Sequence, residues 1–192
     1  MIAGVDEVGR GCLSGPVFSA AIIFNKKIDV SGIIDSKMMS RNLRVKAFKY
    51  LIKNSTYAIG TASVLEIEKF NILNASLLAM QRAIDKLKIK PKLVLIDGNF
   101  APKKLKLNFK TIINGDKKIP VISAASIIAK VKRDLFMTKL SKNYPEYDWK
   151  NNFGYGTPKH LIALQKYGIT KHHRKKFKPI HNILMRRKRE TL

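Results

Sequence analysis

Four carboxylates stand at positions where this chain could perform metal chemistry. Asp6 and Glu7 are adjacent acids that follow a short apolar run. Asp97 ends a second apolar run, and Asp116 follows a third. Because strand ends at one edge of a sheet commonly converge, we expect these acids to meet there, where they would repel one another unless cations were bound. Carboxylate oxygens suit Mg²⁺ or Mn²⁺, and two such ions roughly 3.5–4 Å apart can activate water and stabilise the leaving oxygen of a phosphodiester.

Turn formation is the alternative explanation for some of these acids. Asp97 and Asp116 each lie next to a glycine, a pattern common in turns, and Asp6 could cap a backbone segment. This explanation suits Asp116 best. It suits the pair Asp6 and Glu7 poorly, because two adjacent acids after an apolar strand have no evident structural role.

The charge balance points to an anionic partner. Lys and Arg number 38 and Asp and Glu 13, giving a formal net charge of +25. Such an excess attracts nucleic acid first and an anionic membrane surface second, although a genome biased toward Lys and Ile would raise the charge of any protein. Cys12 is the single cysteine, which argues against a zinc site at His172 and His173. No apolar stretch is long enough to cross a membrane and no secretion signal is evident, so we expect a cytoplasmic protein that is a monomer.

Apolar patterns predict an α/β fold over residues 1–192. Strands are expected at residues 2–5, 16–24, 57–64, 93–96 and 109–113. Helices are expected at residues 41–53, 65–87, 123–140 and 158–167. The unbroken apolar run at 93–96 is typical of a strand buried on both faces. Residues 171–192 hold nine Lys or Arg and one Glu, and we expect a basic extension there with a short helix over its apolar insert at 180–185.

An ordered series of motifs resembles the ribonuclease HII family over nearly the whole chain. The motifs are GVDEVGRG at 4–11, LSGPV at 13–17, DSK at 35–37, NIL at 71–73, MQRA at 80–83, LIDGN at 95–99, GD at 115–116, SAASIIAKV at 123–131, RD at 133–134, GY at 154–155, and HHR through FKP between 172 and 179. Any one of these is weak, whereas the ordered set is highly specific.

The resemblance implies one RNase H-like catalytic domain, a mixed and roughly five-stranded sheet flanked by helices, with a helical C-terminal portion. The implied activity is endonucleolytic cleavage of the RNA strand of RNA–DNA hybrids. It also includes cleavage on the 5′ side of single ribonucleotides in duplex DNA, leaving 3′-hydroxyl and 5′-phosphate ends. Such a ribonuclease H of type II would use two Mg²⁺ or Mn²⁺ ions held by its four acids.

Substrate-binding roles follow from the same resemblance. Gly9, Arg10 and Gly11 would sense the ribose 2′-hydroxyl, since glycines let backbone groups approach a substrate closely. Tyr155 would pack on the sugar at the RNA–DNA junction. A plain tight turn and ordinary loop packing are the structural alternatives for these two segments.

Phosphate contacts are expected from Lys37, Ser126 and Lys130, of which the last two share one helix face at a spacing of four. The alternative for Lys37 is an exposed surface charge. Asp134 is a candidate for the fourth acid, but its mid-helix setting favours an ion pair, so we prefer Asp116.

Two other classes of protein remain. A non-catalytic, basic RNA- or DNA-binding protein explains the charge but not Asp6 and Glu7, which would repel phosphates without a metal. A metal-dependent nuclease or recombinase that cuts DNA would share the acids but needs no sensor for a 2′-hydroxyl at residues 9–11.

Overall fold

The computed structural model, which describes residues 1–25, 28–30, 33 and 39–190, is built around one five-stranded sheet. The strands are β1 (Ile2–Val8), β2 (Val17–Phe24), β3 (Ser55–Ala62), β4 (Leu93–Asp97) and β5 (Phe109–Ile112). β1 lies at the centre, β2 and β3 continue on one side as antiparallel strands, and β4 and β5 continue on the other as parallel strands. The expectation of a mixed, five-stranded sheet is confirmed.

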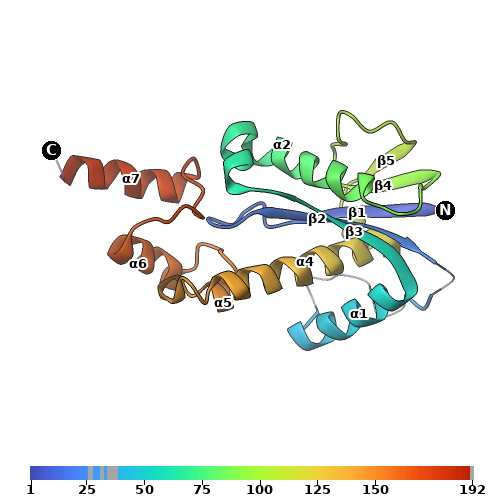
Figure 1. The fold of residues 1–192 in the computed structure, drawn as a ribbon, viewed down its shortest axis with the longest axis horizontal. Helices are drawn as coiled ribbons and strands as arrows, with labels where there is room; N and C mark the ends of the chain where they lie inside the picture. Colours follow the sequence, from blue (N-terminus) through green and yellow to red (C-terminus); the bar gives the residue numbers. More distant parts are fainter. Residues whose placement is uncertain (26–27, 31–32, 34–38, 191–192) are drawn as a thin grey trace.

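Helices cover both faces of this sheet (Figure 1). α4 (Pro120–Leu140) and α1 (Arg41–Asn54) lie on one face, and α2 (Val64–Asp85) lies on the other. Gly4 lets α4 approach β1 closely, because a Cβ added there would lie 2.2 Å from the carbonyl oxygen of Val121. The central strand and the helix with the most buried residues are thereby held in direct backbone contact. No helix in the described part of the chain is long and apolar enough to cross a membrane.

The C-terminal third extends beyond one end of the sheet (Figure 1). After the short α3 (Gly115–Lys118), its elements are a 3-10 turn (Pro145–Tyr147), α5 (Trp149–Asn152), α6 (Pro158–Tyr167) and α7 (Lys178–Glu190). These elements enclose a separate apolar cluster around Trp149, Tyr147 and Leu164, and Leu13 from the N-terminal region joins that cluster. The second core therefore ties this third to the loop that follows β1.

Several boundaries differ from the sequence expectation. β1 continues to Val8, so Asp6 and Glu7 lie within the strand rather than after it. α4 begins at Pro120, because proline is well suited to the first turn of a helix. A short helix that was not predicted forms around Asp116, and α7 extends beyond the predicted 180–185 in both directions.

Candidate carboxylate site

A cavity of about 320 Å³ opens at the end of the sheet from which α5–α7 extend. We call it the carboxylate pocket. It is lined by Asp6, Glu7, Val8, Arg44, Asp97, Ser126, Lys130 and Tyr155. Six of these eight residues were predicted as site residues from the sequence.

Strand pairing explains why two of the acids meet. β1 and β4 run parallel with Val5 opposite Ile96, so the next residues along the two strands, Asp6 and Asp97, stand side by side. α4 crosses the same face and supplies Ser126, whose hydroxyl hydrogen-bonds the Asp6 carboxylate. A β-sheet register and one helix thus place three functional groups together.

Asp6 carries an unfavourable charge in this setting. Only 4% of the residue is exposed, and burial is the main reason that the pKa of its carboxyl lies well above the usual value. Repulsion from Glu7 and Asp97 raises it further, while hydrogen bonds from the Ser126 hydroxyl and the Glu7 amide partly oppose the change. A bound cation would relieve this repulsion.

Glu7 is also destabilised as an anion. Burial raises the pKa of its carboxyl, Asp97 adds to the effect, and Arg10 opposes it. The Arg10 guanidinium lies 3.4 Å from a Glu7 carboxylate oxygen, and about half of the Arg10 side chain is exposed. Such a long, solvent-exposed ion pair is weak, so a divalent cation can displace Arg10 and bind the Glu7 carboxylate.

Asp97 is anchored by the start of α3. One of its oxygens, Oδ1, accepts hydrogen bonds from the backbone amides of Gly115 at 2.7 Å and Asp116 at 3.3 Å. Asp116 is itself 3% exposed, and its carbonyl accepts a hydrogen bond from the Ser123 hydroxyl. Asp116 therefore adjoins Asp97, but it is not among the residues that line the carboxylate pocket.

Asp134 lies one helical turn from Lys130 and forms an ion pair with it at 2.7 Å. The Lys130 ammonium also stands over the ring of Phe153, 4.8 Å from its centroid, and 5.9 Å from that of Tyr155. The pair matches the structural role expected for Asp134. It also holds Lys130 between the two aromatic rings at the wall of the pocket.

A divalent cation is compatible with these groups. Within the described ranges, no three His, Cys, Asp or Glu side chains already form a closed ligand cluster. The donor set is nevertheless the right kind, because three acidic side chains line one cavity and two of them are destabilised as free anions.

A buried arginine holds the loop that follows β1. The Arg174 guanidinium donates to the carbonyl oxygens of Gly9 at 2.7 Å, Arg10 at 2.8 Å and Gly15 at 2.8 and 3.0 Å. Arg174 is fully buried, and burial is the main reason that its pKa falls to about 10, so it remains charged at neutral pH. Gly9 has a φ of +92°, a conformation that favours glycine.

A second buried arginine joins this loop to the one that carries Tyr155. Arg133 donates to the carbonyls of Ser14, Pro16 and Phe153 at distances of 2.9–3.1 Å. The two loops also share backbone hydrogen bonds, in which the Gly154 carbonyl accepts from the amides that follow Cys12. We refer to Arg133 and Arg174 together as the arginine clamp.

Tyr155 is positioned from two directions. Burial, followed by the neighbouring Cys12 thiol, raises the pKa of its hydroxyl. Its carbonyl oxygen lies 2.8 Å from Nδ1 of His160. Cys12 is fully buried on the loop after β1, and its proximity to Tyr155 could not be predicted because the two residues are far apart along the chain.

A chain of neutral histidines supports the Tyr155 carbonyl. Nε2 of His160 accepts from the indole of Trp149 at 3.1 Å and lies 3.1 Å from Nε2 of His173. Nδ1 of His173 accepts from the Thr170 amide at 2.9 Å. Every ring nitrogen is thus occupied without a second proton, and burial lowers the pKa of both histidines, that of His173 to about 3.

The positions of the remaining predicted residues vary. Arg10 and Gly11 are exposed on the loop after β1, and Gly9 is buried beneath them. Lys37 lies outside the described residues. The sequence reasoning did not identify Arg44, which reaches the pocket from α1, or the clamp role of Arg133 and Arg174, because buried arginines without acidic partners leave no local pattern.

Comparison with known proteins places these residues in a family. The sequence matches the family model described as Ribonuclease HII over residues 3–180. A Ribonuclease HII of Pelagibacter ubique is 59% identical over 184 residues, which cover 96% of this chain and 99% of that protein. A Ribonuclease HII of Wolbachia from Brugia malayi is 49% identical, with 97% and 92% covered. The crystal structure of ribonuclease H2 from Pyrococcus horikoshii is similar with a TM-score of 0.79 and 28% identity, covering 96% of this chain and 97% of that one.

Proposed function

This chain belongs to the ribonuclease HII family of hydrolases, which cleave the RNA strand of RNA–DNA hybrids, and on that basis we propose how its residues perform the reaction. Asp6, Glu7, Asp97 and Asp116 are the catalytic acids and the ligands of two Mg²⁺ or Mn²⁺ ions. The enzyme also cuts on the 5′ side of single ribonucleotides in duplex DNA, and it leaves 3′-hydroxyl and 5′-phosphate ends. The observation that carries the proposal is the convergence of three of these acids on one pocket with Lys130 and Tyr155 in its wall.

The carboxylates would hold the cations, and other residues of the pocket would hold the substrate. Bound divalent cations supply electrostatic stabilisation of the scissile phosphate and lower the pKa of the attacking water. Ser126 keeps the Asp6 carboxylate oriented through its hydrogen bond. Lys130, Ser126 and Lys37 contribute contacts to phosphate oxygens.

The loop after β1 provides selectivity for RNA. We propose that backbone groups of Gly9, Arg10 and Gly11 contact the 2′-hydroxyl. The arginine clamp supports this proposal, because it fixes the Gly9 and Arg10 carbonyls while the other edge of the loop faces solvent. Tyr155, 40% exposed at the pocket wall, would pack on the neighbouring deoxyribose.

Asp116 is our choice for the fourth acid. Its amide lies 3.3 Å from Oδ1 of Asp97, whereas Asp134 is already paired with Lys130.

We further propose that residues 1–192 act as one catalytic domain, with the basic segment at about 171–192 adding salt-sensitive affinity for duplexes. A monomer is sufficient for this function, because every proposed site residue comes from one chain.

The decisive experiment compares two duplexes with and without Mg²⁺ or Mn²⁺. One is DNA with a single embedded ribonucleotide, and the other is the same duplex made only of DNA. We expect one incision, on the 5′ side of the ribonucleotide, and none in the control. Equal cutting of both duplexes would favour a DNA nuclease, and binding without cutting would favour a non-catalytic protein.

A further inference from the structure

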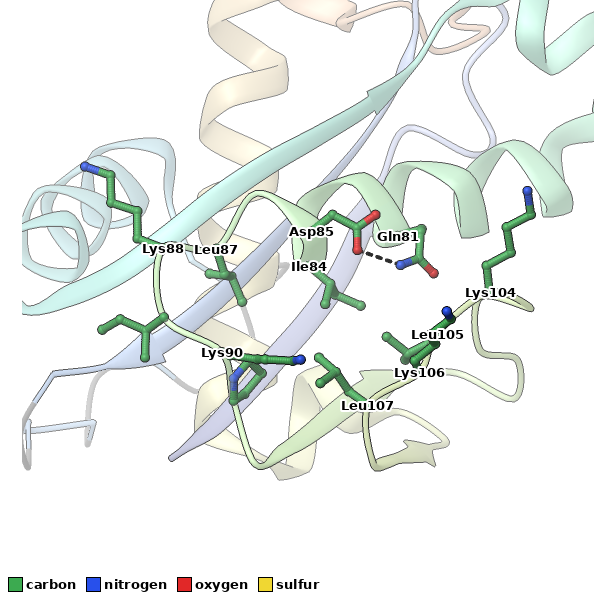
Figure 2. A pocket seen from close by; sticks show the side chains of 12 residues that line it. Gln81, Ile84, Asp85, Leu87, Lys88, Lys90, Lys104, Leu105, Lys106 and Leu107 are labelled. Atoms are coloured by element: carbon green, nitrogen blue, oxygen red, sulfur yellow. Dashed lines mark hydrogen bonds between the residues drawn. The ribbon is translucent and has the colours of Figure 1, made fainter.

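A groove with an apolar floor lies between α2 and the connection from β4 to β5. It comprises two adjoining cavities of about 400 and 180 Å³, whose walls share Gln81 and Lys104. Figure 2 shows Ile84 and Leu87 on one side of the larger cavity and Leu105 and Leu107 on the other. Ile84 is a buried member of the core cluster under α2, and the three leucines pack against that cluster, so the floor is continuous with the core.

Positive charge surrounds this apolar floor. The walls contain five exposed lysines and one acid: Lys88, Lys90, Lys103, Lys104, Lys106 and Asp85. The carboxylate of Asp85, the single acid, accepts a hydrogen bond from the Gln81 side-chain amide at 2.7 Å (Figure 2). A ligand for this groove must therefore be negatively charged and must also carry apolar groups.

Gln81 offers a further specific contact. Its Oε1 is buried, and no hydrogen-bond donor of the described residues reaches it. A buried acceptor without a partner costs free energy, and a small rotation of the Gln81 side chain toward the groove would let a ligand N–H group recover it. Main-chain amides of a peptide supply such donors at regular intervals, whereas a phosphodiester backbone has none.

We propose that this groove, formed by α2 from Asn74 to Asp85, by residues 87–91 and by residues 102–107, docks a linear acidic segment with aliphatic side chains from a partner protein. The aliphatic side chains contact the floor, the carboxylates meet the lysines, and one amide donates to Gln81. The α2 stretch spans about 16 Å at 1.5 Å per residue, which matches about five residues of extended peptide.

The groove lies apart from the carboxylate pocket. Lys90 and Pro91 precede β4, while Asp97 ends it, and the strand separates the two sites by about 15 Å. No residue lines both cavities. A protein docked in the groove would therefore leave the pocket open, so the contact can recruit the enzyme without blocking its reaction.

Fluorescence anisotropy with a labelled peptide of about eight residues, alternating Asp or Glu with Leu or Ile, tests the proposal. Two comparison peptides replace either the acids with Lys or the aliphatic residues with Ser. The groove variant is Lys88→Glu with Lys104→Glu, and its matched control is Lys49→Glu with Lys53→Glu on α1, which changes the net charge equally at exposed positions. An oligothymidylate of similar length serves as the anion without aliphatic groups.

We expect the acidic aliphatic peptide alone to bind, with affinity falling at least about tenfold in the groove variant and by less than about threefold in the control. Gln81→Met should weaken binding by about five- to tenfold, because it removes the acceptor but keeps the side-chain length. Cleavage of a ribonucleotide-containing duplex should be unchanged in all three variants. Equal loss of peptide binding in both double variants, or weaker cleavage and weaker oligothymidylate binding in the groove variant alone, would overturn the proposal in favour of a nucleic-acid surface.

Discussion

Replacing Arg174 with lysine tests whether the arginine clamp positions residues 9–11, the sensing loop that we propose contacts the 2′-hydroxyl. Arg174 satisfies three backbone carbonyls, and lysine keeps the charge but cannot reach all three from one nitrogen. The Arg10 carbonyl belongs to an exposed residue and can turn to water, whereas Gly9 and Gly15 are buried. Each buried carbonyl left without a donor costs about 1–3 kcal/mol, so the variant should lose about 1–6 kcal/mol of unfolding free energy.

That loss lies mostly within the stability of an ordinary domain, about 5–15 kcal/mol, so the variant should still fold. Activity should fall more sharply than stability suggests, because a displacement of about 1 Å at a substrate contact can cost about a hundredfold in rate. The assays are urea denaturation and the rate of incision at a single embedded ribonucleotide.

Arg82→Lys is the matched control. Arg82 is partly exposed, pairs with Glu66 at 2.6 Å and lies on α2, away from the carboxylate pocket. We expect it to lose no more than about 1 kcal/mol and to keep full activity. If Arg174→Lys kept both its denaturation midpoint and its incision rate, the positioning role of the clamp would be refuted.

Three further predictions follow from the site and its supports. Asp6→Asn should abolish cleavage. In thermal scans without metal at neutral pH, the same variant should melt about 2–4 °C higher for each kcal/mol of carboxylate repulsion that is relieved. Added Mg²⁺ should raise the melting temperature of the unsubstituted protein only. Asp116→Asn should lose cleavage about a hundredfold or more, while Asp134→Asn should keep most of it in the same incision assay; the reverse result would exchange their roles. His173 is neutral in the folded protein, where its pKa is about 3, but in the unfolded chain it accepts a proton below about pH 6.5. The unfolding free energy present at pH 7 should therefore fall by about 2 kcal/mol at pH 5. Urea titration measures this loss, and His173→Gln should lack it.

The sequence predicted the central strands because their residues carry the signal locally. The unbroken apolar run of β4 and the acid that ends it indicated both a buried strand and a site, and the register of β1 with β4 then made Asp6 and Asp97 neighbours. Boundaries were less accurate where tertiary contact decides them. α3, for example, forms around residues whose glycine and aspartate are equally typical of a turn.

The supports of the site could not be predicted in the same way. Arg133 and Arg174 donate to carbonyl groups rather than to acids, and any residue has a carbonyl, so no spacing of charges reveals the partners. The Cys12 contact with Tyr155 joins two loops whose proximity depends on the fold of the C-terminal third. Short sequence motifs identify the candidate reacting groups. The residues that hold those groups in place cannot be identified in this way, because their contacts depend on long-range packing.

The hydrogen bonds between Arg174 and Gly15 join residues 159 positions apart. The residues directly before them, Ser14 and His173, add a β-bridge, so a segment near one terminus completes a loop near the other. Contacts of such long sequence separation form late, since loop-closure entropy opposes them until the intervening elements are in place. During synthesis the sheet can assemble well before residue 174 is available, but the sensing loop cannot. On the proposed role of residues 9–11, a nascent chain would hold its acids in position before it can discriminate RNA from DNA, and selectivity would be the last property that folding confers.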